Sequence, residues 1–184
     1  FRNPHGLDTH DDHLSSAYDM AILTQYAMTN ETFQTISSTK KYRSQGEHVR
    51  VFHNKNRLLT EKYDYSTGGK TGYTKLAKRT LVSTASKDGL NLITVTLNDP
   101  NDWDDHMNLF NWGFKQFKLH TLIEAGPLNV RADAFYEDHL TVKHPLVYPL
   151  SENEKTTIKP NLELKAPPKE GFTNEELQHP VGKM

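Results

Sequence analysis

The stretch Ser66-Thr67-Gly68-Gly69-Lys70-Thr71-Gly72-Tyr73-Thr74 places three glycines around one lysine and its neighbouring hydroxyl. Glycine is unfavourable inside a strand unless the backbone passes close to another group, such as a ligand. Lys70 would supply a positive charge and Thr71 a directed hydrogen bond, a pair suited to a terminal carboxylate. We therefore predict an edge strand over residues 65–73 that binds an anionic ligand.

Four other segments surround this strand in a fixed order. They read Phe1-Arg2-Asn3-Pro4-His5-Gly6-Leu7, Phe52-His53-Asn54-Lys55-Asn56-Arg57-Leu58-Leu59, Arg79-Thr80-Leu81-Val82-Ser83-Thr84-Ala85-Ser86 and Leu90-Asn91-Leu92-Ile93-Thr94-Val95-Thr96-Leu97. Together with Lys70-Thr71-Gly72, the series resembles the serine-type D-alanyl-D-alanine carboxypeptidases, the low-mass penicillin-binding proteins of the peptidase S11 type. The resemblance runs from Phe1 to Gly126 and continues more loosely to the end of the chain.

The resemblance implies an α+β fold, with part of a β-lactamase/transpeptidase-like domain followed by a small all-β domain. The residues favour the same architecture, because strands 79–86 and 90–97 are apolar on both faces and suit a sheet covered by helices on both sides. Lys87-Asp88-Gly89 reads as the hairpin turn between these two strands. Composition changes at Gly126-Pro127, so we expect the first domain over 1–125 and the second over 126–184.

Two helices are expected to pack on this sheet. Ser16 and Asp19 form a capping box for a helix that ends near Thr29. A second helix is predicted over 102–118, with His106 at the boundary of its buried stripe. The stripe is apolar and recurs at intervals of three and four: Trp103, Met107, Phe110, Phe114 and Phe117.

A last strand is predicted over 119–124, and beyond it the chain shows strand-like alternation without a helical period. The alternating segments are 128–132, 140–143, 156–158 and 162–165.

Several polar groups are expected to be solvated rather than functional. Lys75, Lys78 and Arg79 read as turn charges. The first fourteen residues contain a set of histidines and aspartates whose spacing fits no fixed metal-ligand geometry: His5, Asp8, His10, Asp11, Asp12 and His13.

Two short matches to catalytic motifs are interpreted as coincidences. Ser37-Ser38-Thr39-Lys40 matches Ser-x-x-Lys, in which one helical turn brings the lysine beside the serine. The residues around Ser37 read as a strand or loop, and both this match and Ser151-Glu152-Asn153 stand in the wrong order relative to Lys70. We expect the true Ser-x-x-Lys and Ser-x-Asn motifs before Phe1, so the nucleophile is not in this chain.

The resemblance implies hydrolysis of the terminal D-Ala-D-Ala bond of peptidoglycan stem peptides through a serine acyl-enzyme. Lys70 would hold the terminal carboxylate, and Thr71 would hydrogen-bond the same group. Gly72 would leave room for the peptide to lie along the strand. The backbone N–H of Tyr73 would form half of the oxyanion hole.

The resemblance also implies β-lactams as acylating inhibitors, no metal or organic cofactor, and a location at the outer face of the cytoplasmic membrane or in the cell wall. It further implies that membrane association is possible through a C-terminal segment that is not seen in this sequence. A net charge of −1 gives no sign of a nucleic-acid partner, and the lack of cysteine excludes disulfides and thiolate metal sites.

Two alternatives stay open at this point. A non-catalytic wall-binding or interaction module of the same fold would form no covalent adduct with penicillin. A β-lactamase would share Lys70-Thr71-Gly72 and turn the adduct over quickly, but the β-rich tail after Gly126 argues against it.

Overall fold

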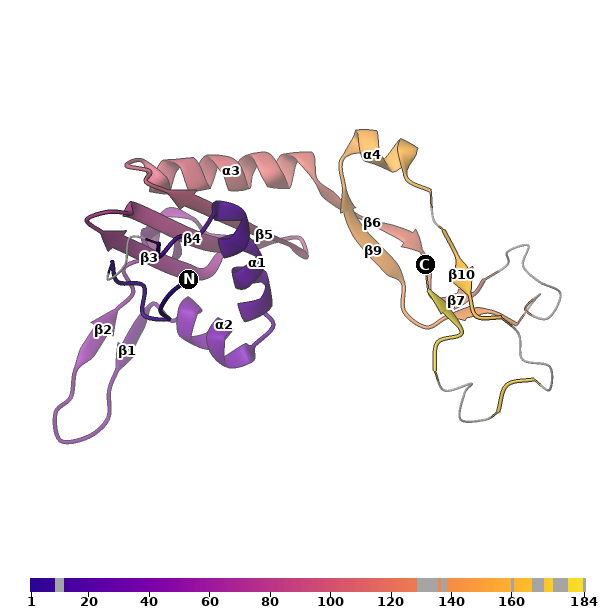
Figure 1. The fold of residues 1–184 in the computed structure, drawn as a ribbon, viewed down its shortest axis with the longest axis horizontal. Coiled ribbons are helices and arrows are strands. Elements are labelled where there is room, and N and C mark those ends of the chain that lie inside the picture. Colours follow the sequence, from indigo (N-terminus) through magenta and orange to yellow (C-terminus); the bar gives the residue numbers. More distant parts are fainter. Residues whose placement is uncertain are drawn as a thin grey trace. The chain divides into compact units, whose positions relative to one another are not determined.

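The computed structural model describes residues 1–8, 12–128, 136, 139–159, 161–166, 171–173 and 179–183. The chain forms two compact units, Phe1–Gln116 and Phe117–Met184. Most elements of both are labelled in Figure 1. The division into domains at 125/126 stays a prediction, and the units are described here one at a time.

The first unit is built on a three-stranded antiparallel sheet. Its strands are β3 (Ser66–Thr74), β4 (Lys78–Lys87) and β5 (Leu90–Leu97), in the order β3-β4-β5. The β4–β5 turn has positive φ at both central residues, 52° at Asp88 and 81° at Gly89, as a tight hairpin requires. The predictions for these three strands and this turn are confirmed.

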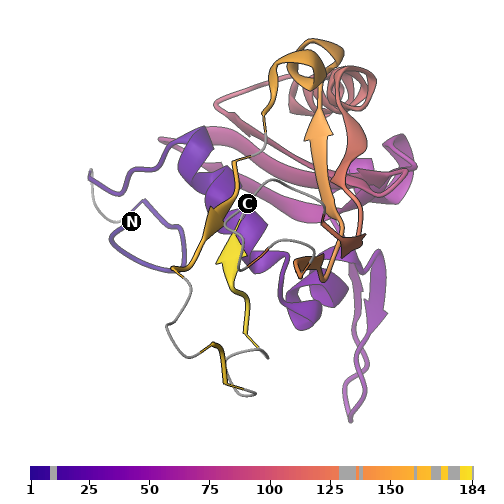
Figure 2. The same cartoon turned by 90° about the vertical axis from the view of Figure 1, so that its right-hand side faces the viewer.

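Helices cover both faces of this sheet, as predicted. In Figure 1, α3 (Asp102–Gln116) lies on one side, and α1 (Ala17–Ala27) and α2 (Glu31–Ser38) lie on the other. The view turned by 90° in Figure 2 shows the same layering. Ser16 caps α1 by accepting a hydrogen bond from the Asp19 backbone N–H, so the predicted helix start is confirmed.

The core lies between α3 and the sheet. Phe110 is completely buried and Phe114 nearly so, and Leu81 and Ala85 are buried on β4, one of the two strands that α3 contacts. Phe110 stacks on Phe114 and on Tyr63, with ring centroids 6.4 Å and 5.5 Å apart. The aromatic stripe of α3 is therefore a packing surface.

Three local predictions in this unit are wrong. Ser37 lies in a helix, because the Asn30 side chain caps α2 by accepting a hydrogen bond from the Phe33 backbone N–H. His106 is fully buried rather than at a boundary, since it packs against Thr96 of β5. Arg79 is not a solvated turn charge, as its guanidinium holds the buried carboxylate of Asp102 in two hydrogen bonds of 3.2 and 2.5 Å.

Two further elements complete the first unit. A hairpin of β1 (Lys41–Arg43) and β2 (Val51–His53) projects away from the sheet in Figure 1. A short π-helix, η1 (Leu58–Lys62), then leads to β3 and buries Leu58 and Leu59.

The second unit consists mainly of short paired strands. The pairs are β6 (Lys118–Ile123) with β9 (Leu146–Leu150), β7 (Gly126–Pro127) with β8 (Thr141–Val142), and β10 (Glu163–Leu164) with β11 (Gly182–Lys183). The strand predicted over 156–158 is wrong, because α4 (Glu152–Thr157) occupies that segment. Most of the predicted 128–132 strand lies outside the described residues. Within the part of the chain that the structure describes, no helix has the length and apolarity of a membrane span.

Candidate functional site

The candidate site is the outer strand of the first unit's sheet. Within the described residues, β3 pairs with β4 on one side only, so its other edge carries no strand. Lys70 is exposed near the middle of β3, and its Nζ donates to the backbone carbonyl of Thr71. No carboxylate among the described residues forms an ion pair with Lys70. The ammonium is therefore accessible to an external anion.

The side chains of Lys70 and Thr71 start on opposite faces of the sheet. Lys70 lies opposite Val82, whereas Thr71 lies opposite the buried Leu81 on the face that α3 covers. Successive side chains alternate in this way along any strand. One ligand can contact both groups only if it lies along the open edge of β3, which is the placement of an added strand.

Glycines allow the strand to bend just before Lys70. The pairing with β4 shifts register between Ser66 and Gly68, and φ is 146° at Gly68 and 133° at Gly69. A Cβ at Gly69 would lie 2.1 Å from the Val82 carbonyl oxygen, and one at Gly68 would lie 2.8 Å from Ser37 Oγ. Only glycine fits these two positions, which fixes where the backbone places Lys70.

Gly72 and Tyr73 follow Lys70 at the exposed end of the strand. Gly72 is exposed, and a Cβ there would lie 2.4 Å from Thr80 Oγ1 on the neighbouring strand. The Tyr73 side chain is also exposed. The structure thus groups Lys70, Thr71, Gly72 and Tyr73 on one accessible strand, and their roles remain predictions.

Asn56 is a buried residue that holds the start of this strand, and its role was not predicted from the sequence. Its side chain is 1% exposed, donates to the Gly68 carbonyl at 3.3 Å and accepts from the Leu58 backbone N–H at 3.1 Å. Asn54 adds a second tie by donating to the carbonyls of Ser37 and Thr39. The available signal was two asparagines spaced by two just before Leu58-Leu59, a polar pair beside a buried segment.

We expect Asn56→Ala to lower the free energy of unfolding of the full-length protein by about 2 kcal/mol, because the Gly68 carbonyl and the Leu58 N–H would be buried without partners. Denaturant unfolding followed by tryptophan fluorescence measures this loss. Asn91→Ala is the matched control, since Asn91 is an exposed asparagine on β5. Equal stability of the two variants would contradict the role given to Asn56.

The two motif matches have structural roles. Ser37 lies near the end of α2 and donates to the Gln34 carbonyl, while Lys40 follows the Thr39 C-cap and is outside the helix. The two side chains therefore do not share a helical turn. Ser151 is the N-cap of α4 in a capping box with Glu154, whose pKa these hydrogen bonds lower.

The histidines and aspartates of the first residues help to shape their loop. Asp8 accepts from the Leu76 backbone N–H, His13 accepts from the Arg2 N–H, and Asp12 pairs with the Arg2 side chain. His10 and Asp11 lie outside the described residues. The described residues, those of this loop included, contain no group of His, Cys, Asp or Glu side chains placed to hold a metal ion.

Comparison with known proteins gives one consistent set of matches. A family model described as D-alanyl-D-alanine carboxypeptidase matches residues 1–101. The chain is 33% identical over 121 residues to the D-alanyl-D-alanine carboxypeptidase DacB2 of Mycobacterium tuberculosis, covering 60% of this chain and 40% of the relative. It is 30% identical over 156 residues to DacA of Haemophilus influenzae, covering 78% of this chain and 37% of the relative.

A solved structure extends the similarity into the second unit. The crystal structure of penicillin binding protein 5 from Haemophilus influenzae superposes with a TM-score of 0.68 at 28% identity, covering 89% of this chain and 49% of that one. The predicted fold class is thereby confirmed. The chain spans between 32% and 40% of the length of the curated relatives.

Proposed function

The chain belongs to the peptidase S11 family of D-alanyl-D-alanine carboxypeptidases, and from this we propose that the full protein removes the terminal D-alanine from peptidoglycan stem peptides. The observation that carries the proposal is Lys70, an exposed ammonium without an ion-pair partner among the described residues, on an edge strand shaped by glycines. A free carboxylate is the natural ligand for such a group.

In the proposed complex the peptide lies along the open edge of β3. Lys70 holds the terminal carboxylate from one face of the strand, and Thr71 donates its hydroxyl to the same carboxylate from the other. The alternation of these two side chains across the sheet supports an edge-bound peptide over one bound to either face. This chain thus contributes the wall that fixes the substrate's C-terminus.

The chemical step needs a nucleophile that this chain does not supply. A serine outside this chain would attack the carbonyl between the two D-alanines, forming an ester and releasing D-alanine, and water would then hydrolyse the ester. The backbone N–H of Tyr73 would donate to the oxyanion, an interaction worth roughly 2.7–4 kcal/mol in the transition state. The reaction needs no metal or organic cofactor.

The proposed substrate sets the location and the inhibitors. Peptidoglycan stem peptides lie outside the cytoplasmic membrane, so the protein would act at its outer face or in the wall. A β-lactam resembles D-Ala-D-Ala and would acylate the same serine.

Intact-mass analysis of the full-length protein after incubation with penicillin tests the proposal directly. We expect one long-lived penicilloyl adduct and release of D-alanine from a soluble peptide ending in D-Ala-D-Ala. No adduct and no D-alanine would leave the non-catalytic wall-binding module as the better description. An adduct that turns over rapidly would indicate a β-lactamase.

Enlarging Gly72 should obstruct the peptide. We expect Gly72→Val to raise the KM for the soluble peptide about tenfold, because the new side chain would stand on the same face as Lys70 and crowd Thr80. Steady-state kinetics on the full-length protein measure the change, with Asn91→Val, at an exposed position of β5, as the control. An unchanged KM in a folded Gly72→Val variant would contradict the edge-bound pose.

A further inference from the structure

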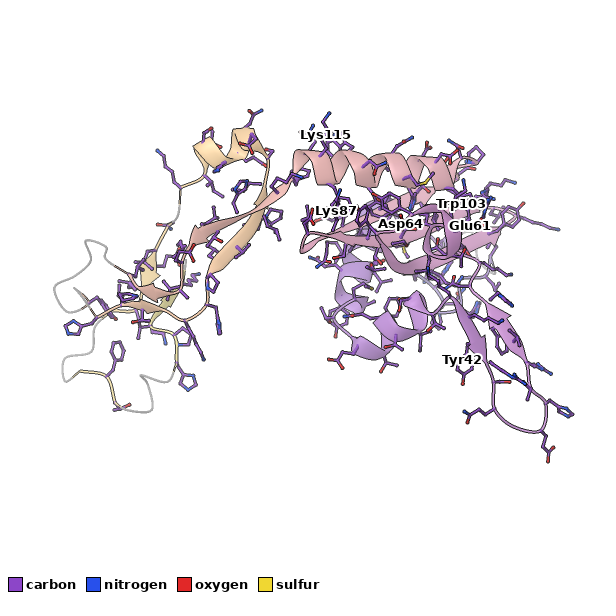
Figure 3. The ribbon with its side chains drawn as sticks, turned by 180° about the vertical axis from the view of Figure 1, so that it is seen from behind. Tyr42, Glu61, Asp64, Lys87, Trp103 and Lys115 are labelled. Atoms are coloured by element: carbon purple, nitrogen blue, oxygen red, sulfur yellow. The ribbon has the colours of Figure 1, made fainter. Side chains whose placement is uncertain are left out.

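The β1–β2 hairpin is the most exposed element of the first unit. All six residues of its two strands are exposed, including Tyr42 at 58% and Phe52 at 54%. Figure 3 shows Tyr42 clear of the sheet on this projecting hairpin. A two-stranded ribbon with exposed aromatic rings has little stability by itself, so these rings indicate a contact surface.

The hairpin and its flanking residues also form a basic segment of the chain. Residues 40–55 contain five lysines or arginines and a single acidic residue, Glu47, whereas the whole chain has a net charge of −1. None of the five cations forms an ion pair with another described residue. The near-zero net charge of the whole chain therefore gives no indication of this basic cluster. Its members are Lys40, Lys41, Arg43, Arg50 and Lys55.

The register of the hairpin sorts these residues into two faces. Tyr42 lies directly opposite Phe52, and the backbone bonds Asn54 N–H to Lys40 and Ser44 N–H to Arg50 continue the ladder by one pair at each end. Lys40, Tyr42, Phe52 and Arg50 therefore share one face, which we term the aromatic face. Its two cations flank the aromatic pair at levels roughly 14 Å apart along the strands.

We propose that the aromatic face binds an acidic polysaccharide of the cell wall. Sugar rings present C–H groups that pack on aromatic rings, and acidic substituents to either side would meet Lys40 and Arg50. The proposal rests on the proposed function, which brings the protein to the wall. Asn54 and Asn56 tie the base of the hairpin to α2 and to Gly68, so a polymer held there is anchored to the strand that carries Lys70.

Two other occupants fit the hairpin less well. A lipid bilayer would favour apolar residues at the tip, but the tip from Gln45 to His48 is polar. A second copy of the chain would bring two strongly basic hairpins together, which electrostatic repulsion opposes.

Co-sedimentation of the full-length protein with purified cell-wall sacculi tests the proposal. We expect the double variant Tyr42→Ser/Arg50→Gln to bind sacculi about tenfold more weakly than the wild type. Its affinity for sacculi should also fall less steeply as the salt concentration rises. The matched control is Tyr148→Ser/Lys155→Gln, which removes the same kinds of exposed side chain from the second unit. Wild type should likewise lose affinity for sacculi stripped of their acidic polymers.

Hydrolysis of the soluble peptide separates this proposal from the proposed function. The rate of peptide hydrolysis should be unchanged in both double variants. If the wild type did not hydrolyse the peptide, the carboxypeptidase activity would be rejected, but the measurement of sacculus binding would remain valid. Equal sacculus binding by wild type and the hairpin variant would overturn the polysaccharide site. Hairpin-dependent binding to phosphatidylglycerol vesicles rather than sacculi would also overturn it, as would hairpin-dependent self-association in sedimentation velocity.

Discussion

Replacing Lys70 with alanine in the full-length protein is expected to lower kcat/KM for the soluble D-Ala-D-Ala peptide about 100-fold. A hydrogen bond to a charged group contributes roughly 1.5–3 kcal/mol, and each 1.4 kcal/mol is about tenfold. Acylation by penicillin should slow by a similar factor, because the β-lactam carboxylate would occupy the same position. Stopped-flow acylation and steady-state hydrolysis measure the two effects.

Because Lys70 is exposed, its replacement should change activity without changing the stability of the fold. Its side chain is exposed, and among the described residues its hydrogen bond is to the neighbouring carbonyl of Thr71, so its removal should change the free energy of unfolding by less than about 0.5 kcal/mol. Lys75→Ala removes an exposed charge from the turn that follows the same strand and serves as the control. A Lys70→Ala protein that acylates at the normal rate would show that the central assignment is wrong.

The sheet could be predicted from the sequence because the residues that specify it lie close together along the chain. Apolar strands with an Asp88-Gly89 turn between them, and a stripe recurring every three or four residues, specify β4, β5 and α3 without knowledge of distant contacts. The glycines around Lys70 likewise marked a close backbone approach, which the structure places at Val82 and Ser37.

The errors arise where a tertiary contact or a cap decides the outcome. Ser37 and its neighbours have low helix propensity, but the Asn30 side chain caps α2 and stabilises its first turn. Arg79 reads as a turn charge until Asp102, 23 residues later, is placed beside it. The role of Asn56 could not be predicted for the same reason, since its hydrogen-bond partner Gly68 is 12 residues away.

The other large effect concerns acid stability and His106. Its ring is fully buried between α3 and β5, its Nε2 lies 3.1 Å from Thr96 Oγ1, and its Nδ1 has no hydrogen-bond partner among the described residues. Burial lowers the pKa of His106 to about 4, although the charges of Asp102 and Asp99 act in the opposite direction. The folded state therefore keeps this ring neutral at pH values where the unfolded chain protonates it.

The sign of the effect follows from that difference. The ordinary histidine pKa is 6.5, so the unfolded state takes up a proton between pH 6.5 and about 4 that the folded state does not. The free energy of unfolding therefore falls as the pH falls through this range, by about 3 kcal/mol in all. Denaturant unfolding at a series of pH values measures this slope, and Trp103 and Trp112 report on it because both lie on α3.

Carboxylates titrate in part of the same range, so the prediction is a difference between proteins. His106→Gln should unfold with a shallower dependence on pH between 6.5 and 4 than the wild type, whatever its stability at neutral pH. His53→Gln, on the exposed β2 strand, is the control and should retain the wild-type slope. Parallel slopes for wild type and His106→Gln would mean that the buried ring is not the acid-sensitive group, and that the packing of α3 on β5 tolerates a charge at its centre.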